Sequence, residues 1–311
     1  MSGRSAPAAL EAAAALLGSR ARRDVPLGPL TTYRVGGPAA LYLEARDEED
    51  LAVARRAVTE TGVPVLVVGR GSNLLVADRG FPGLAVVLGE RFAGIEIDGT
   101  EVTAGAAVSL PVLARRTAAA ALTGLEWAVG VPGSVGGAVR MNAGGHGSDV
   151  SRSLVWARVV ALEGNDLHGQ VAADRLALGY RSSALTPAHV VTAARFSLAA
   201  GDRAASEAEI AEIVRWRREH QPGGSNAGSV FTNPPGDSAG RLIEAAGLKG
   251  YRRGSAYVSP KHANFVQVDA DGSADDVAAL IAEVRRLVAE RTGVDLRLEL
   301  HQVGFPTLEE R

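Results

Sequence analysis

Apolar residues in the first two thirds of the chain fall into short runs that alternate with helix-like stretches. The runs PVLVVG (64–69) and LAVVL (84–88) are typical of buried strands. A second strand-rich block follows at residues 94–98, 101–105, 155–162 and 190–198. Near the C-terminus, LRLELHQV (296–303) alternates strictly, which predicts a strand with Leu296, Leu298 and Leu300 on one face.

Helix starts are predicted where a capping residue stands three positions before an acidic residue. Three such pairs precede helical apolar periods: Asp47 with Asp50, Ser206 with Glu209, and Ser273 with Asp276. The apolar positions that follow them are Leu51, Ala54 and Val58; Ile210, Ile213 and Val214; and Val277, Leu280, Ile281, Val284, Leu287 and Val288. A shorter helix is expected near Ser238 to Ala246, where Gly247 ends it.

The Ala-rich start of the chain predicts a loosely attached helix in residues 1–22. Glu11 breaks its apolar run, and arginines follow where a signal peptide would have its small-residue cleavage site. Further along, the small-residue stretch 199–206 is the candidate domain boundary. The pattern as a whole predicts an α+β protein of two or three units.

Composition limits the function classes. Charged residues make up 22% of the 311 residues and the net charge is −2, so the chain lacks the basic balance of a nucleic-acid binder. It has no cysteine, which excludes disulfides and thiolate chemistry, and its six histidines show no metal-ligand spacing. No apolar stretch reaches the roughly 18 residues of a membrane helix. We therefore expect a cytoplasmic protein without metal, nucleic-acid partner or membrane insertion.

Two glycine-bearing segments stand out. In VGVPGSVGGAVRMNAGGHGSD (129–149), apolar residues recur among seven glycines, which favours a buried, fixed loop over a flexible linker. In VVGRGSNLLVAD (67–78), a strand runs into Gly69 and Gly71. Backbone N–H groups in such turns can approach a phosphate, although a tight strand-ending turn explains the segment 67–78 equally well. Neither segment matches the dinucleotide fingerprint or the P-loop.

The two segments in this order resemble the FAD-binding domain of the UDP-N-acetylenolpyruvoylglucosamine reductases, the MurB family. Matching segments extend over nearly the whole chain, from TTYRVGGPA (31–39) to ELHQVG (299–304). Between these lie GRGSNLLV, GVPGSVGGAVRMNAGGHG, GYRSS, AGSVFTNP, SAGRLIEAAGLKG and KHANFVQV. The stretch from 180 to 229 is too short for a large insertion, so the chain looks like the shorter subclass that lacks the tyrosine-bearing loop.

The resemblance implies a two-lobed FAD-binding domain of the PCMH/VAO type in residues 23–200, split near residue 90, and an α+β substrate-binding domain in residues 201–311. It implies noncovalent FAD, with NADPH as hydride donor. The turn at 69–74 has no histidine or cysteine for a covalent link, and His146 is expected to pack or hydrogen-bond instead. The residues assigned to FAD are Arg34, Gly69, Arg70, Gly71, Ser72, Asn73, Leu74, Gly130, Val131, Pro132, Gly133, Ser134, Gly136, Gly137, Ala138, Asn142, Ala143 and Gly144.

The implied reaction reduces UDP-N-acetylglucosamine enolpyruvate to UDP-N-acetylmuramate in peptidoglycan precursor synthesis. The resemblance assigns charge stabilisation to Arg181, proton donation to Ser229, and a role in polarising the substrate carboxylate or the proton path to Glu299. Without it, these residues are more simply a surface arginine, a turn-forming serine and a salt-bridged glutamate. Two departures from the family pattern are Thr232, where many members carry a basic residue, and His301, where an arginine is frequent.

Four residues are expected to bind the UDP-sugar: Tyr180, Asn233, Lys249 and His262. Arg217 and Arg218 are further candidates for its diphosphate. We expect a monomer or weak oligomer. Two alternatives stay open, namely another FAD oxidoreductase of the same fold and a non-catalytic flavin- or nucleotide-binding relative. The first would be expected to lose Arg181, Ser229 and Glu299 together, and the second to lose part of that set.

Overall fold

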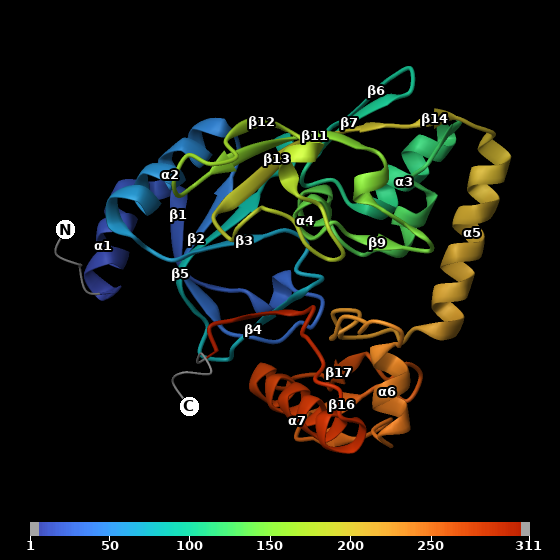
Figure 1. The fold of residues 1–311 in the computed structure, drawn as a ribbon. Helices are drawn as coiled ribbons and strands as arrows, with labels where there is room; N and C mark the ends of the chain where they lie inside the picture. Colours follow the sequence, from blue (N-terminus) through green and yellow to red (C-terminus); the bar gives the residue numbers. More distant parts are fainter. Residues whose placement is uncertain (1–5, 306–311) are drawn as a thin grey trace. The chain divides into compact units, whose positions relative to one another are not determined.

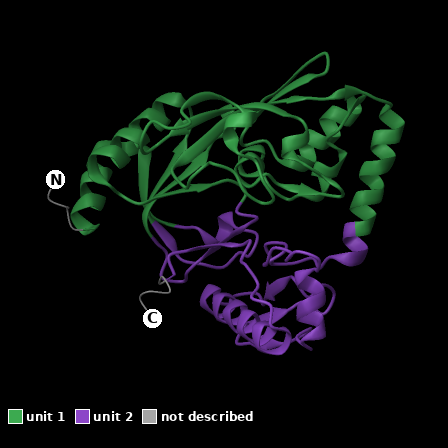
Figure 2. Cartoon of the chain, in the orientation of Figure 1, with its two compact units in different colours: residues 1–25, 40–70, 82–216 green, residues 26–39, 71–81, 217–311 purple. Residues whose placement is uncertain are grey.

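A computed structural model describes residues 6–305 of the protein (Figure 1). The chain forms two compact units (Figure 2). Unit 1 comprises residues 1–25, 40–70 and 82–216, and unit 2 comprises residues 26–39, 71–81 and 217–311. The chain therefore passes between the units several times. The domain boundaries expected from the sequence stay a prediction.

The first sheet has four strands in the order β1 (Ala21–Pro26), β2 (Pro38–Ala45), β5 (Phe81–Leu88) and β3 (Val65–Val68). Strands β3 and β5 run parallel, with Val65 opposite Leu84. Both apolar runs predicted as strands are thus confirmed. Helix α2 (Glu48–Thr61) begins where expected, because the Asp47 side chain accepts a hydrogen bond from the Asp50 N–H at 3.1 Å.

The N-terminal helix α1 (Ala6–Leu17) is part of the core of unit 1, so the expectation of a loosely attached helix is wrong. Ala13 and Leu17 are fully buried and belong to the same apolar cluster as Leu51 and Ala54 of α2. Helices α1 and α2 lie side by side (Figure 1). The spacing of four residues between Ala13 and Leu17 places both on the face that meets α2.

The second sheet is antiparallel and has five strands. Their order is β12 (Gly169–Ala172), β11 (Leu154–Ala161), β13 (His189–Ser197), β7 (Glu101–Gly105) and β6 (Ile95–Asp98). In its centre Ala157, Ala194 and Ala104 lie in register on three neighbouring strands. Unit 1 also contains the helices α3 (Leu110–Ala119) and α4 (Val135–Met141), and α4 packs against β13. Short pairs complete the unit: β8 (Leu122–Thr123) with β14 (Ala199–Ala200), and β9 (Gly144–Gly145) with β10 (Ser148–Asp149).

Helix α5 (Arg203–His220) starts earlier than its predicted cap. The Asp202 side chain accepts a hydrogen bond from the Ala205 N–H at 2.8 Å and so takes the capping role. Ser206 is buried inside the helix instead, and its hydroxyl donates to Glu126 at 2.6 Å. Ile210 and Ile213 are buried as expected, whereas Val214 is 39% exposed.

Unit 2 contains the sheet β15 (Arg252–Arg253), β16 (Ala256–Val258) and β17 (Val266–Val268), together with α6 (Ala239–Ala245) and α7 (Ala274–Thr292). The cap predicted for α7 is confirmed, because Ser273 accepts from the Asp276 N–H; α6 is capped by Ser238, which accepts from the Arg241 N–H. Apolar residues of α6, α7 and this sheet form one core, which Tyr33, Val35 and Leu75 join from the earlier segments.

The C-terminal strand is shorter than predicted. β18 spans only His301–Val303 and pairs in parallel with β4 (Leu74–Val76). Leu296 and Leu300 are buried, but Leu298 is 38% exposed. Leu298 makes an isolated bridge to Phe231 before the chain reaches β4. The segment changes neighbours along its length, so its alternation does not produce one continuous strand.

Candidate active site

Both glycine segments line one cavity of about 260 Å³ within unit 1. Gly69 and Arg70 reach it from the end of β3, and Ser134, Gly136 and Gly137 reach it from the start of α4. Its remaining walls are Val67, Val68, Val87, Leu88, Ala106, Ala107, Arg140, His189 and Val191. The two glycine segments therefore lie around one cavity.

Gly69 and Ser134 explain why the first segment needs a glycine at this point. A Cβ on Gly69 would lie 2.7 Å from Ser134 Oγ, closer than Cβ atoms are found in practice. Ser134 itself caps α4 by accepting a hydrogen bond from the Gly137 N–H. The missing side chain thus lets the two segments approach each other at the rim of the cavity.

The two segments differ in the backbone donors that they can offer. The N–H groups of Val135 and Gly136 donate to Val108 and Ala106 at 2.9 and 3.0 Å, and the Gly137 N–H is capped by Ser134. Residues 135–141 of the second segment therefore form a capped helix and not the loop expected, and the amides of residues 135–137 already have partners in the protein. By contrast, the N–H groups of residues 70–72 make no hydrogen bond to another residue in the described range 6–305.

Arg140 is a cavity residue that the sequence analysis missed. It lies half-buried in the last turn of α4 and lines the cavity with Gly136 and Gly137. Burial lowers the pKa of its guanidinium. Its spacing of three and four residues from the two glycines was the available signal, because such positions share one helix face.

The GYRSS turn is tied to the second glycine segment by three hydrogen bonds. Asn142 Nδ2 donates to the Gly179 carbonyl at 2.9 Å, and Ser183 Oγ donates to the Arg140 carbonyl at 2.5 Å. Arg181 Nη2 donates to the Gly144 carbonyl at 2.9 Å. Three predicted site residues, Arg181, Asn142 and Gly144, are therefore joined in unit 1.

Arg181 has a backbone φ of 54°, in the left-handed region that non-glycine residues adopt rarely. Strain of this kind concentrates at functional sites and is held by the surrounding structure. Beside it, Tyr180 is 61% exposed, and the Arg181 guanidinium carbon lies 5.2 Å from the centre of its ring. Tyr180 thus presents an exposed aromatic ring, and its substrate role stays a prediction.

The rest of the second segment places its predicted cofactor residues in consecutive elements of unit 1. A short 3₁₀ turn spans Glu126–Gly130, α4 contains Ala138, and Gly144 opens the β9–β10 hairpin. Val131, Pro132, Gly133 and Ala143 connect these elements. In the hairpin turn, His146 packs edge-on against Trp216, with ring centres 5.2 Å apart.

In unit 2, the predicted cofactor residue Asn73 lies against the predicted catalytic residue Glu299. Asn73 Nδ2 donates to the Glu299 carbonyl at 3.0 Å, and the His301 N–H donates to the Asn73 carbonyl at 3.2 Å. The parallel pairing of β4 with β18 continues this contact from Leu74 onward. Residues more than 200 positions apart are thus held together by backbone and amide hydrogen bonds.

Close packing within the protein explains why position 71 is a glycine. Its φ is +58°, and a Cβ there would lie 2.2 Å from the Leu30 carbonyl oxygen. The Thr32 N–H donates to the Gly71 carbonyl at 3.2 Å. Arg34, two residues after Thr32, has a backbone φ of 61°, and its N–H donates to Thr31 Oγ1 at 3.1 Å. The TTYR segment and the GRGSN turn, both predicted to meet FAD, therefore pack on each other.

Ser229 lies next to the segment that carries Glu299. The N–H of Glu299 donates to the carbonyl of Val230 at 2.9 Å, and Phe231 bridges Leu298 in antiparallel fashion. The two predicted catalytic residues of unit 2 are consequently on adjacent, hydrogen-bonded stretches of backbone.

The remaining predicted substrate residues gather around α6. Asn233 Oδ1 accepts a hydrogen bond from the Ala239 N–H at 3.1 Å, and Lys249 forms a 2.8 Å ion pair with Glu244. His262 would lie 3.4 Å from a Cβ on Gly240. Burial lowers the pKa of His262. The three residues all contact α6, although Asn233 and Lys249 already have protein partners.

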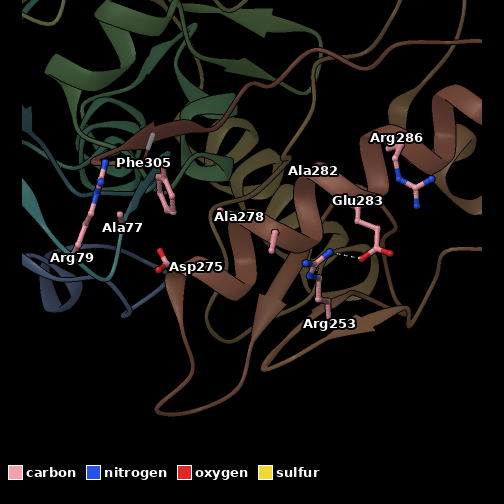
Figure 3. A pocket seen from close by; sticks show the side chains of 10 residues that line it. Ala77, Arg79, Arg253, Asp275, Ala278, Ala282, Glu283, Arg286 and Phe305 are labelled. Atoms are coloured by element: carbon pink, nitrogen blue, oxygen red, sulfur yellow. Dashed lines mark hydrogen bonds and ion pairs between the residues drawn. The ribbon is translucent and has the colours of Figure 1, made fainter. Parts of the chain in front are cut away.

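A second hollow, of about 530 Å³, lies in unit 2 along the alanine-rich face of α7 (Figure 3). Arg79 and Phe305 lie at one end of it, and an ion pair of 3.0 Å between Arg253 and Glu283 lies farther along (Figure 3). Its lining includes neither Ser229 nor Glu299, nor any residue of the two glycine segments predicted to bind FAD. The larger space is therefore separate from the predicted chemistry.

The described part of the chain holds no cluster of three or more His, Cys, Asp or Glu side chains suited to a metal ion. None of its helices is long and apolar enough to cross a membrane.

Comparison with known proteins matches both halves of the chain. Residues 39–170 match the FAD binding domain family, and residues 220–303 match the C-terminal domain of UDP-N-acetylenolpyruvoylglucosamine reductase. The reductase of Acidiphilium cryptum is 44% identical over 91% of this chain and 91% of its own length. That of Rubrobacter xylanophilus is 42% identical over 92% of this chain and 96% of its own.

A solved structure supports the same relationship. The crystal structure of the reductase from Thermus caldophilus aligns with a TM-score of 0.78 and 37% identity, covering 91% of this chain and 99% of that one. The expected fold, an FAD-binding domain followed by an α+β domain, is confirmed by these matches. The chain belongs to the UDP-N-acetylenolpyruvoylglucosamine reductase family.

Proposed function

We propose that this protein reduces UDP-N-acetylglucosamine enolpyruvate to UDP-N-acetylmuramate in peptidoglycan precursor synthesis, with FAD bound noncovalently and NADPH as hydride donor. The observation that carries the proposal is the cavity in unit 1 that both glycine segments line, in a chain of this family. A UDP-sugar and NADPH are accordingly its small-molecule partners.

The residues present fit FAD on structural grounds. The cavity has apolar strand ends for an aromatic ring, two arginines and no acidic lining residue. Arg70 adds a backbone N–H group without a partner among the described residues, and such a group suits a diphosphate. FAD held there would supply the two-electron redox chemistry between NADPH and the enolpyruvyl double bond.

Arg181 is proposed to stabilise negative charge on the substrate. Hydride addition at the methylene carbon leaves that charge on the carbon bearing the carboxylate, where a guanidinium offers a permanent positive charge and a planar fork. Its hydrogen bond to Gly144 and the strained backbone at φ 54° support a fixed position for this side chain.

Ser229 is proposed to donate the proton from Oγ to that carbon. A serine hydroxyl is a weak acid, so it can serve only because the carbanion that it protonates is a strong base. Glu299, on the adjacent backbone, is proposed to assist by polarising the substrate carboxylate or the proton path. The hydrogen bond between the Glu299 N–H and Val230 supports their joint action.

Tyr180, Asn233, Lys249 and His262 are proposed to hold the UDP-sugar. Exposure of Tyr180 and the grouping of the other three around α6 support this assignment. We also propose that the enzyme acts in the cytoplasm as a monomer or weak oligomer, which size-exclusion chromatography with light scattering would test.

The function is tested by an anaerobic titration of the purified protein followed through its flavin absorbance. We expect NADPH to bleach the absorbance and UDP-N-acetylglucosamine enolpyruvate to restore it. Bleaching without restoration would contradict the substrate assignment. A protein that contains no flavin and takes up no added FAD would contradict the cofactor assignment.

A further inference from the structure

Arg140 presents a cation to the cavity from the same helix face as the two glycines that line it. Gly136, Gly137 and Arg140 all contribute to the cavity wall. On a helix, residues three and four positions apart are neighbours, so the two missing side chains leave open the surface beside Arg140. The arginine backbone is fixed, because its carbonyl accepts a hydrogen bond from Ser183 Oγ at 2.5 Å.

The Arg140 guanidinium has no counter-charge in the described part of the chain. No hydrogen bond or ion pair between residues 6 and 305 engages it, and burial alone shifts its pKa. Some other helix arginines have acidic partners, such as Arg56 with Glu60 and Arg203 with Glu207. Removing a cation from water without a partner is costly, so this position calls for an anion that the polypeptide does not supply.

The surroundings favour an anionic ligand over a protein partner. The charged lining residues of the cavity are Arg70 and Arg140, and none of its lining residues is acidic. His189 is already engaged at both ring nitrogens, by Thr186 and by the Asp166 carbonyl. The amides of residues 135–137 are engaged as well. Arg140 is therefore the cationic donor that the second glycine segment offers to the cavity.

We infer that Arg140 binds the diphosphate of FAD and is a determinant of cofactor affinity in this chain. A guanidinium provides a planar pair of N–H donors that matches phosphate oxygens. The inference rests on the proposed function, since it takes FAD as the ligand of the cavity. It adds a contact from the second glycine segment that comes from a side chain and not from the backbone.

The test compares FAD binding to the full-length protein after removal of bound flavin. Arg140→Gln removes the charge at similar size, and Arg140→Lys keeps the charge without the fork. Arg116→Gln is the matched control, because Arg116 is exposed in the last turn of α3 and lies outside the cavity. Flavin fluorescence gives the dissociation constant for FAD at about 50 and 300 mM KCl, a range over which screening changes strongly.

We expect Arg140→Gln to weaken FAD binding about tenfold or more, Arg140→Lys to weaken it less, and Arg116→Gln to leave it within about twofold. The salt dependence of binding should decrease in Arg140→Gln, because one ionic contact is lost. Equal affinity in wild type and Arg140→Gln would overturn the inference, as would weaker binding with unchanged salt dependence. Failure of the wild-type protein to bind FAD would instead count against the proposed function, so the two failures are distinguishable.

Discussion

Asn264 holds the backbone of Phe231 with both atoms of its side-chain amide. The Phe231 N–H donates to Oδ1 at 3.0 Å, and Nδ2 donates to the Phe231 carbonyl at 2.8 Å. A third bond joins the Val230 N–H to the Asn264 carbonyl at 2.9 Å. Asn264 is almost fully buried, so these bonds form without competition from water. They fix the stretch that begins at Ser229.

Replacing Asn264 should therefore disturb Ser229 without touching the flavin. In Asn264→Ala two buried backbone groups lose their partners, and we expect a loss of about 2 kcal/mol in unfolding free energy. The rate of flavin reoxidation by substrate should fall, while FAD content is retained. Urea unfolding and stopped-flow absorbance measure the two effects. Glu290→Ala, at an exposed position of α7 in the same unit, is the control, and equal behaviour of the two variants would contradict a positioning role.

Ser229→Ala should separate the two half-reactions. The change removes only the proposed proton donor, so flavin reduction by NADPH should remain within about twofold while reoxidation by the enolpyruvyl substrate falls by about 100-fold or more. Stopped-flow absorbance records each half-reaction separately. An equal slowing of both would argue against proton donation by this hydroxyl.

Arg181→Ala should abolish enolpyruvyl reduction with FAD still bound. Arg181→Lys keeps a positive charge but loses the planar fork, and we expect it to recover only a small part of the rate. Flavin absorbance after gel filtration checks cofactor retention, and turnover with NADPH checks the reaction. Loss of the flavin in both variants would assign Arg181 to the cofactor instead, through its bond to Gly144.

Asp50 gives unit 1 an acid-sensitive element. Its buried carboxylate accepts from the Arg46 N–H at 2.9 Å, from Arg46 Nε at 3.0 Å and from Arg20 Nε at 3.0 Å. Hydrogen bonding to Arg46 lowers its pKa below the ordinary 3.8. The native state therefore releases this proton more readily than the unfolded state does, so the stabilisation is complete above about pH 5 and disappears as the pH falls through the lowered native pKa.

Asp50→Asn should accordingly destabilise the protein by about 2 kcal/mol near neutral pH. The difference from wild type should shrink as the pH falls below 3.8, where the unfolded carboxyl is protonated. Urea midpoints at neutral and acidic pH measure this, with the exposed Asp98→Asn as control. A difference that is constant with pH would show that the charge of Asp50 is not the stabilising factor.

Substitutions at two glycines with positive φ distinguish the energetic cost of backbone strain from the cost of close packing. At Gly62, with a φ of +68°, a Cβ would meet no atom within 4 Å, whereas at Gly71 it would lie 2.2 Å from the Leu30 oxygen. We expect Gly62→Ala to cost about 1–2 kcal/mol from its backbone conformation alone and Gly71→Ala to cost about 3 kcal/mol or more. Thermal unfolding compares them. Equal losses of stability in the two variants would mean that the backbone around Leu30 and the TTYR segment shifts easily to accommodate a Cβ at position 71.

The sequence by itself determined the features that depend on neighbours within a few residues. Asp47 and Ser273 cap helices as predicted, because a cap requires only an N–H three positions later. The apolar runs at 64–69 and 84–88 form strands β3 and β5. The ordered motifs also indicated the family, since both glycine segments and the later motifs occur in one chain.

The tertiary structure decided the features that depend on distant partners. Ser206 is a buried donor to Glu126 and not a cap, since a carboxylate 80 positions away lies within its reach. Leu298 is exposed because its segment passes from Phe231 to β4, which no alternation pattern encodes. Arg140 resembles any helix arginine in the sequence. Only the folded chain shows that it lines a cavity without an acidic partner among the described residues, because burial and the absence of a counter-charge are properties of packing.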